Sequence, residues 1–211
     1  MKTQKYEFTG AEKQVGYHTL RQIRRLSDGL IGGWVESEAN LSHQGDCFVY
    51  DNAEVYGNAW VNDNAKVLGN ALVYGNAWVS GNACVYEKAR VYDYAKVYGN
   101  ALVYGNAWVY GNALVFGDAQ VFRDARVYGN AQVFGDAWIF RYANVYDNAE
   151  VYGNAGVFGN ACVYGNAWVY GNALVYDNAH IYDDAKVCGD TRVYGNAEVY
   201  KDTKLSGEKI A

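Results

Sequence analysis

The sequence predicts an all-β fold in which a single chain winds into a solenoid of short parallel strands. A six-residue unit, typified by VYGNAL, recurs from Val49 to Lys204 without insertion or deletion, giving 26 hexads. The apolar positions of the unit, Ala at position five and Val at position one of the next hexad, lie two residues apart and so face the same side of an extended strand. A helical period of about 3.6 residues would scatter these valines around the axis, which excludes a helix.

The six positions of the unit differ in what they tolerate. Position one is Val in 24 hexads and Ile in two, and position five is Ala in 24 and Thr in two. Position two is aromatic in 22 hexads, position three is usually Gly, position four is Asn in 17 and Asp in six, and only position six varies freely. Because Gly and Asn tolerate the left-handed backbone region, we expect a four-residue strand followed by a two-residue corner.

This pattern, an aliphatic residue followed four positions later by a small one, resembles the hexapeptide-repeat family. The resemblance implies a left-handed parallel β-helix with three hexads, or 18 residues, in each triangular coil. The stretch from Ile31 to Ile210 accommodates ten such coils. Residues three hexads apart should then lie above one another, about 4.8 Å apart.

Residues 1–30 contain no hexads and are predicted to form an N-terminal cap, a hairpin of Tyr6–Phe8 and Tyr17–Leu26 separated by Gly10 to Gly16. Such a cap would cover the open strand edges and the core of the first coil. Six basic and three acidic residues give the segment a net charge of +3, against −8 for the remainder of a chain whose total is −5. We interpret the basic residues as a solvated face and expect no nucleic-acid partner, because the body is acidic. The basic residues are Lys2, Lys5, Lys13, Arg21, Arg24 and Arg25.

Residues 31–48 are predicted to form one degenerate coil, followed by the regular solenoid over residues 49–204. Read as IGGWVE, SEANLS and HQGDCF, they place Val35, Leu41 and Cys47 at the inward position five. Residues 32–53, GGWVESEANLSHQGDCFVYDNA, are similar to a segment of uncharacterised bacterial and phage hexapeptide proteins that carry an acetyltransferase label. His43 stands at position one of its hexad, where we interpret it as a partly buried structural residue.

Residues 205–211 are a fading coil that loses Ala and Tyr, and we expect either that Leu205 and Ile210 fold over the last coil or that a partner covers it. The four cysteines do not lie at stacking distances, so free thiols in a reducing cytoplasm are expected. No apolar run of about 18 residues predicts a membrane span, and no secretory leader is recognisable.

Stacking at the three-hexad period sorts the outward position-two side chains into three ladders. The second ladder is interrupted at Leu68, and the third lapses at Asn62, Ser80 and Cys188. The first ladder is unbroken and consists of Tyr56, Tyr74, Tyr92, Tyr110, Tyr128, Tyr146, Tyr164, Tyr182 and Tyr200. The ladders could simply brace a thin solenoid through aromatic stacking, or a flat aromatic face could bind a partner, and the two roles are compatible.

The position-six column beside the first ladder contains Trp108 between Arg90 and Arg126. Aromatic and Arg side chains near the centre of an interface typically carry most of its binding energy. We therefore predict a binding face centred on Trp108, Tyr110 and Tyr128. Its further members are Arg90, Arg126, Tyr92 and Tyr146. The expected partner is a protein or a second copy of the chain, and we expect no cofactor and no metal.

Acyl transfer is the enzymatic alternative, because the hexapeptide family includes acyltransferases that use a histidine base, a loop thrown out from the coil and an acyl-carrier site between subunits. No such loop interrupts residues 49–204, and only His180 lies on the regular solenoid, with Asp177, Asp183 and Asp184 nearby in sequence. A general base needs an oriented partner and a water-excluding pocket, so His180 is a weak catalytic candidate. Three hypotheses therefore stay open: a non-catalytic binding or scaffold protein, an acyltransferase relative dependent on acetyl-coenzyme A, and a phage-encoded inhibitor that docks on a host protein.

Overall fold

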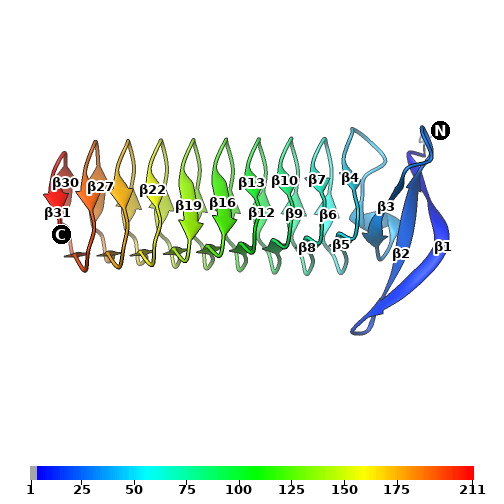
Figure 1. The fold of residues 1–211 in the computed structure, drawn as a ribbon, viewed down its shortest axis with the longest axis horizontal. Coiled ribbons are helices and arrows are strands. Elements are labelled where there is room, and N and C mark those ends of the chain that lie inside the picture. Colours follow the sequence, from blue (N-terminus) through cyan, green and yellow to red (C-terminus); the bar gives the residue numbers. More distant parts are fainter. Residues whose placement is uncertain (1–3) are drawn as a thin grey trace.

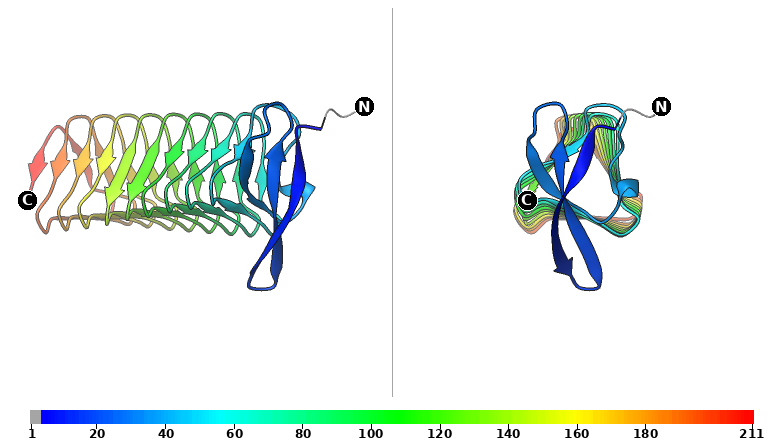
Figure 2. Two further views of the ribbon diagram at one scale, coloured as in Figure 1. Left: turned by 45° about the vertical axis from the view of Figure 1, so that its right-hand side comes forward. Right: turned by 90° about the vertical axis from the view of Figure 1, so that its right-hand side faces the viewer.

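The computed structural model describes residues 4–211 as an elongated β-solenoid with an N-terminal hairpin at one end (Figure 1). Strands of successive coils pair in parallel and form three sheets of 12, 10 and 9 strands. Seen along its axis, the solenoid has a roughly triangular outline (Figure 2). The only helical element among the described residues is one 3₁₀ turn, η1, Glu38–Asn40. The prediction of an all-β parallel solenoid of about ten coils is confirmed, and the left-handed sense implied by the resemblance stays a prediction.

Each sheet takes one strand from each regular coil. The first sheet contains β1 Tyr6–Val15, β2 His18–Arg25, β3 Ile31–Val35, β5 Glu54–Val55, β8 Leu72–Val73, β11 Arg90–Val91, β14 Trp108–Val109, β17 Arg126–Val127, β20 Asn144–Val145, β23 Cys162–Val163, β26 His180–Ile181 and β29 Glu198–Val199. The second contains β4 Phe48–Val49, β7 Lys66–Val67, β10 Cys84–Val85, β13 Leu102–Val103, β16 Gln120–Arg123, β19 Trp138–Arg141, β22 Gly156–Val157, β25 Leu174–Val175, β28 Arg192–Val193 and β31 Lys209–Ile210. The third contains β6 Trp60–Val61, β9 Trp78–Val79, β12 Lys96–Val97, β15 Leu114–Val115, β18 Gln132–Val133, β21 Glu150–Val151, β24 Trp168–Val169, β27 Lys186–Cys188 and β30 Lys204–Ser206.

The strands of the regular coils are shorter than the four residues expected from the sequence. Most consist of positions six and one alone, because the corner occupies positions two to five. In a representative corner the Ala59 N–H donates to the Tyr56 carbonyl at 3.4 Å, and the Asn58 N–H donates to the Gly75 carbonyl of the next coil at 2.7 Å. Hydrogen bonds between coils therefore continue through the corners.

Position three is the residue that turns each corner. From Asp51 to Lys201, all residues at this position have φ between 53° and 76°, and ten of them are not Gly. Six of these ten are Asp, and each carboxylate accepts the backbone N–H of the position-three residue in the next coil at 2.9–3.3 Å. The inter-coil bond offsets the strain of the left-handed conformation, which explains why Asp can replace Gly here.

The core is a narrow column of the position-one and position-five side chains. Val and Ile at position one are buried throughout the solenoid, as is Ala at position five. Each coil thus buries its small apolar set against the coils above and below. The position-two and position-six side chains remain on the outside, where they form the faces.

The N-terminal hairpin extends the first sheet, because β2 pairs antiparallel with both β1 and β3. Its turn is shorter than expected: β1 continues to Val15 through a bulge between Phe8 and Glu12, and only Gly16 and Tyr17 separate the strands. The tip projects beyond the outline of the coils (Figure 2). Residues 1–3 of the predicted cap, including Lys2, lie outside the described residues.

The basic residues of this hairpin contact neighbouring polar groups. Lys13 pairs with Glu54 of the first sheet at 2.8 Å. The remaining contacts are Arg21 with Glu12, Arg24 with Glu7, Arg25 with Asp28, and Lys5 with the carbonyls of Gly45 and Cys47. These side chains therefore hold the hairpin together and dock it on the first coil.

The register expected for the first coil is wrong in part. Val35 and Leu41 point inward, but they align with the position-one residues Val55 and Val61, and not with position-five alanines. The paired residues of the first and second coils are thus 20 positions apart in sequence (Val35 with Val55), two more than the regular 18. The regular separation begins with the pair Val49 and Val67. Two extra residues therefore lie between Leu41 and Val49, in the segment that contains His43. That histidine is half-buried, stacks on Tyr6 at 4.4 Å and accepts the Lys5 N–H at 3.2 Å, in agreement with a structural role.

The last described coil is formed by β30 and β31. Leu205 pairs with Val187 at the regular three-hexad step, whereas the step from Val193 to its partner Ile210 is one residue shorter. Both side chains are partly buried and pack against the core. They thus complete the final turn of the solenoid by extending two of its sheets.

Candidate functional site: the outer face of the first sheet

The unbroken tyrosine ladder runs along the first sheet from Tyr56 to Tyr200. Neighbouring rings are stacked with centroids 4.9–5.3 Å apart and planes within 10° of parallel. The second sheet has seven consecutive stacked rings, and the third has five. Near-parallel rings over nine coils mean that the coils stack almost without twist, so the face of the first sheet is flat.

Most hydroxyl groups of this ladder are free to bond a partner. Among the described residues, Tyr182 alone in the ladder donates its hydroxyl to a protein acceptor, Glu198 at 3.2 Å. Burial, together with the neighbouring tyrosines Tyr74 and Tyr110, raises the pKa of Tyr92 to about 12. Burial likewise raises the pKa of Tyr110, Tyr128 and Tyr146. The phenols therefore stay neutral at physiological pH and present a row of hydrogen-bond donors.

At the middle of the face the structure brings together the predicted central residues. The guanidinium carbons of Arg90 and Arg126 lie 5.1 and 4.9 Å from the Trp108 ring centroid, one from the coil before and one from the coil after. The edge of Trp108 also contacts Tyr92, with centroids 6.5 Å apart. Within residues 4–211 neither guanidinium has a carboxylate at ion-pair distance. The indole is thus held between two cations whose charges are not neutralised within the chain.

The weak catalytic candidate His180 also lies on this face, in β26, near the C-terminal end. Its ring contacts the edge of Tyr164 at a centroid distance of 6.2 Å. The three aspartates near it in sequence bond elsewhere: Asp177 to the Gly195 N–H, Asp183 to the Lys201 N–H and Asp184 to the Asn166 side chain. Glu198, the partner of His180 in the neighbouring strand, accepts the Tyr182 hydroxyl at 3.2 Å and makes no ion pair with His180 within residues 4–211. The imidazole of His180 therefore has no hydrogen-bonded carboxylate to orient it.

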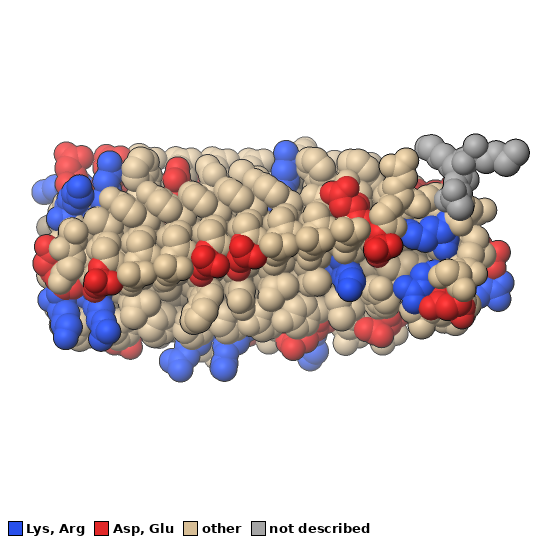
Figure 3. All heavy atoms as spheres, turned by 90° about the horizontal axis from the view of Figure 1, so that it is seen from above, with Lys and Arg blue, Asp and Glu red and all other residues tan. Residues whose placement is uncertain are grey.

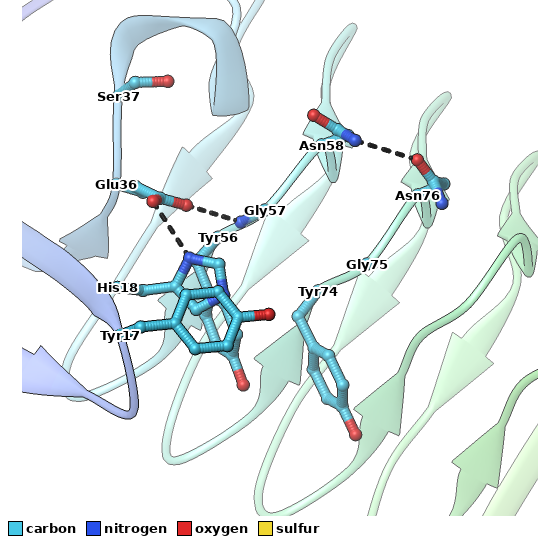
Figure 4. A pocket seen from close by; sticks show the side chains of 10 residues that line it. All are labelled: Tyr17, His18, Glu36, Ser37, Tyr56, Gly57, Asn58, Tyr74, Gly75 and Asn76. Atoms are coloured by element: carbon cyan, nitrogen blue, oxygen red, sulfur yellow. Dashed lines mark hydrogen bonds and ion pairs between the residues drawn. The ribbon is translucent and has the colours of Figure 1, made fainter.

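The hairpin tip forms a pocket of about 540 Å³ at the N-terminal end of the same ladder (Figure 4). The His18 ring contacts the Tyr56 ring at a centroid distance of 5.0 Å with the planes tilted by 49°, and its Nδ1 lies 2.9 Å from Glu36 Oε1. The other oxygen of Glu36 accepts the Gly57 N–H at 2.7 Å. Desolvation opposes ionisation of Glu36, but these two hydrogen bonds prevail and lower the pKa of its carboxyl group.

Sequence reasoning missed this pocket for a specific reason. Glu36 occupies position two of the first coil, where later coils of the first sheet carry Tyr. The regular hexad count does not assign Glu36 to this position, because the first coil contains two extra residues. The highly exposed Tyr17, 91% accessible, lies in the hairpin turn, and His18 is the first residue of β2; neither segment contains a repeat signal. The one available signal was the adjacent pair of aromatic residues beside Gly16 in the N-terminal segment.

Other features of the solenoid supply little chemistry. Most of the middle of the long side visible in Figure 3 is uncharged, and charged side chains of both signs gather toward the two ends. Among residues 4–211 no group of His, Cys, Asp and Glu side chains is arranged to hold a metal ion, and all four cysteines are free. The described part of the chain has no helix long and apolar enough to cross a membrane.

Comparison with known proteins supports the repeat architecture. The family model described as the YdcK beta solenoid repeat matches residues 95–111, 107–123 and 167–183. No curated protein matches the chain. The three matched segments all lie in regular coils, so the chain is similar to this β-solenoid repeat family over residues 95–123 and 167–183.

Proposed function

We propose that this chain is a non-catalytic binding or scaffold protein that uses the outer face of the first sheet to bind a protein partner or a second copy of itself. The observation that carries this proposal is the Trp108 ring held between the unneutralised guanidinium groups of Arg90 and Arg126. Cation–π contacts with the indole connect three neighbouring coils, but they leave the guanidinium N–H groups without a carboxylate partner among residues 4–211. At the centre of an interface, the same arrangement supplies large contact area and charge-assisted hydrogen bonds.

The ladder itself supports a binding role in addition to a structural one. Its ring faces are already used in stacking, which leaves ring edges and hydroxyl groups to meet a partner. Tyr combines apolar area with a polar tip and is enriched at protein interfaces. The flatness of the face over nine coils suits a broad, rigid contact surface.

We do not propose acyl transfer, because His180 lacks an oriented carboxylate on this face and the neighbouring aspartates stabilise corners. Four free cysteines favour a reducing compartment, and we therefore place the protein in the cytoplasm.

Paired substitutions on two faces test the proposal. The double variant Tyr110→Ser, Tyr128→Ser removes two adjacent rings from the first sheet, and Tyr104→Ser, Phe122→Ser removes an equivalent stacked pair from the second sheet. Both variants should lose similar thermal stability, because each removes the same kind of stacking. Only the first should change the sedimentation coefficient or abolish partner capture. Equal behaviour of the two variants would leave the ladder with a structural role alone.

A further inference from the structure

We propose that the pocket at the hairpin tip binds a neutral pyranose sugar, with the sugar ring on Tyr17 and its hydroxyl groups on the corners of the neighbouring coils. The pocket lies at the N-terminal end of the tyrosine ladder, beside Tyr56 and Tyr74. Trp108 lies two coils beyond Tyr74 on the same sheet. The site is therefore separate from the centre of the contact face proposed above and adds a second ligand to the protein.

The pocket is built from two corners of the solenoid and the tip of the hairpin. The corners, residues 56–58 and 74–76, belong to neighbouring coils and are joined by the hydrogen bond from the Asn58 N–H to the Gly75 carbonyl at 2.7 Å. Tyr17 and His18 of the hairpin stand beside these corners (Figure 4). The volume of about 540 Å³ lies in the range of roughly 300–1,000 Å³ that is typical of small-molecule sites.

The pocket offers no free charge to a ligand. Glu36 is the one acidic residue among those that line it, and no Lys or Arg lines it. Both oxygens of Glu36 are already hydrogen-bonded, one to His18 at 2.9 Å and the other to the Gly57 N–H at 2.7 Å. A charged ligand would lose hydration here without an opposite charge to pair with, so the site favours a neutral one.

The Asn pair at the corners leaves one acceptor and one donor unused. The Asn58 Nδ2 group donates to Asn76 Oδ1 at 3.1 Å. In longer rows of the solenoid the second amide donates in turn to an Asn of the next coil, but here the next residue is Tyr94. Within residues 4–211, Asn58 Oδ1 therefore receives no hydrogen bond and Asn76 Nδ2 has no acceptor.

The Gly75 N–H is a further unused donor. At six other corners the N–H at this position is bonded by an Asp carboxylate of the preceding coil, as the Gly69 N–H is by Asp51 at 2.9 Å. The residue of the preceding coil is Gly57 here, and a Cβ atom built on it would lie 3.2 Å from the Gly75 nitrogen. The N–H therefore faces the space that an Asp side chain occupies elsewhere, and that space belongs to the pocket.

These groups match a ligand that carries several hydroxyl groups on a ring. A hydroxyl group both donates and accepts, so neighbouring hydroxyls can satisfy the Gly75 and Asn76 donors together with the Asn58 acceptor. Tyr17 contacts His18 at a centroid distance of 4.3 Å and is otherwise exposed, which leaves the opposite face of its ring free. The apolar C–H face of a pyranose can pack against that ring while its hydroxyl groups reach the corners.

A planar aromatic ligand is disfavoured because the other rings of the pocket have no free face. Tyr56 and Tyr74 stack on each other at 5.1 Å, and Tyr74 also stacks on Tyr92 at 4.9 Å. His18 covers the remaining side of Tyr56. A flat ring could therefore stack on Tyr17 alone, and its edge would meet the corner groups in one plane only.

Titration followed by two-dimensional amide NMR spectra of isotope-labelled protein tests the proposal. The probes are the methyl glycosides of glucose, galactose, mannose and N-acetylglucosamine, and at least one should bind with a Kd of about 1 mM. The amide signal of Gly75 should shift as the site fills. That of Gly153, a corner glycine whose N–H is also unpaired within residues 4–211, should stay unchanged. Benzoate, phenyltrimethylammonium and uracil present a ring with negative, positive or no charge, and each should bind at least about tenfold more weakly than the best glycoside.

Two substitutions, each with a matched control, locate the site. Gly57→Asp should close it from within, because its carboxylate would accept the Gly75 N–H, and should weaken the best glycoside at least about fivefold. Gly117→Asp introduces the same residue at a corner after β15 of the third sheet and should leave the affinity unchanged. Tyr17→Ala should also weaken binding at least about fivefold. Tyr142→Ala removes a ring that is 62% exposed elsewhere on the solenoid and should have no effect.

The outcomes decide the proposal in either direction. Glycoside binding that both site variants weaken and both controls retain supports it. A Gly75 signal that no glycoside shifts at about ten times the expected Kd overturns it. Tighter binding of benzoate, phenyltrimethylammonium or uracil overturns the neutral sugar as the ligand. An affinity that either Gly57→Asp or Tyr17→Ala leaves unchanged overturns the site.

Discussion

Substitution of Gly153 tests why the corners of this solenoid accept only certain residues. Gly153 has φ +70°, and a Cβ atom there would lie 3.1 Å from the Gly171 amide nitrogen and 3.2 Å from its carbonyl oxygen. The left-handed conformation costs a residue such as Ala about 1–2 kcal/mol. The close contact with the next coil adds to this cost, because backbone atoms of a stacked coil cannot move aside. We therefore expect Gly153→Ala to lower the free energy of unfolding by at least about 1–2 kcal/mol.

Gly153→Asp should be less harmful than Gly153→Ala although Asp is larger. The six natural aspartates at position three each accept an N–H from the next coil, as Asp63 does from Gly81 at 3.0 Å. At position 153 the carboxylate would meet the Gly171 N–H in the same way. A hydrogen bond of this kind contributes about 0.5–1.5 kcal/mol, so Gly153→Asp should be more stable than Gly153→Ala by about 1 kcal/mol.

Thermal unfolding followed by circular dichroism at neutral pH measures both effects. For a chain of this length, 1 kcal/mol corresponds to roughly 2–4 °C in Tm. We expect Gly153→Ala to lower Tm by about 2–8 °C, and Gly153→Asp to recover about 2–4 °C of that loss. The reasoning is refuted if Gly153→Ala has no effect, or if Gly153→Asp unfolds at the same temperature as Gly153→Ala or below it.

Three further predictions concern the coil register, the hairpin pocket and the absence of acyl transfer. Inserting one residue after Asn112 should abolish cooperative unfolding, because a one-residue slip turns the inward side chains outward. Asn112→Ala should lower the free energy of unfolding by only about 1 kcal/mol. Denaturation curves of the two variants test this difference. The pKa of Glu36 is lowered in the folded state, so its carboxylate stabilises the fold above its ordinary pKa of about 4.3. This contribution is lost as the pH falls through the lower folded-state pKa. Glu36→Gln should therefore remove that part of the acid dependence when Tm is measured from pH 2 to 7. Calorimetric titration with acetyl-coenzyme A should show no binding, and micromolar binding that disappears in His180→Ala would contradict the account.

The regular part of the fold could be predicted from the sequence because each position of the hexad has a single physical task. Val and Ala alternate with outward residues, and a fixed step of three hexads determines which side chains stack. The predicted neighbours Trp108, Arg90 and Arg126 are therefore adjacent in the structure. Their proximity requires only the repeat length and the strand spacing.

The irregular parts could not be predicted in the same way. The two additional residues between Leu41 and Val49 change the register of the first coil without leaving a recognisable hexad. Arg123 and Arg141 adopt positive φ at corners, a conformation that their residue type does not suggest. The contact of His18 with Tyr56 joins a hairpin tip to the second coil, and such long-range contacts depend on the bend of the hairpin, which local propensity does not determine.

Hydroxyl-radical footprinting of the unmodified protein, read by mass spectrometry at low and high protein concentration, tests most directly whether the first sheet is the contact face. Trp108 on the first sheet and Trp138 on the second provide internal probes of the same residue type, and Trp138 is 53% exposed. We predict that raising the concentration protects Trp108, Tyr110 and Tyr128 while the oxidation of Trp138 stays unchanged. Protection that maps to Trp138 or to the third-sheet residue Trp60, with Trp108 unchanged, would contradict the account.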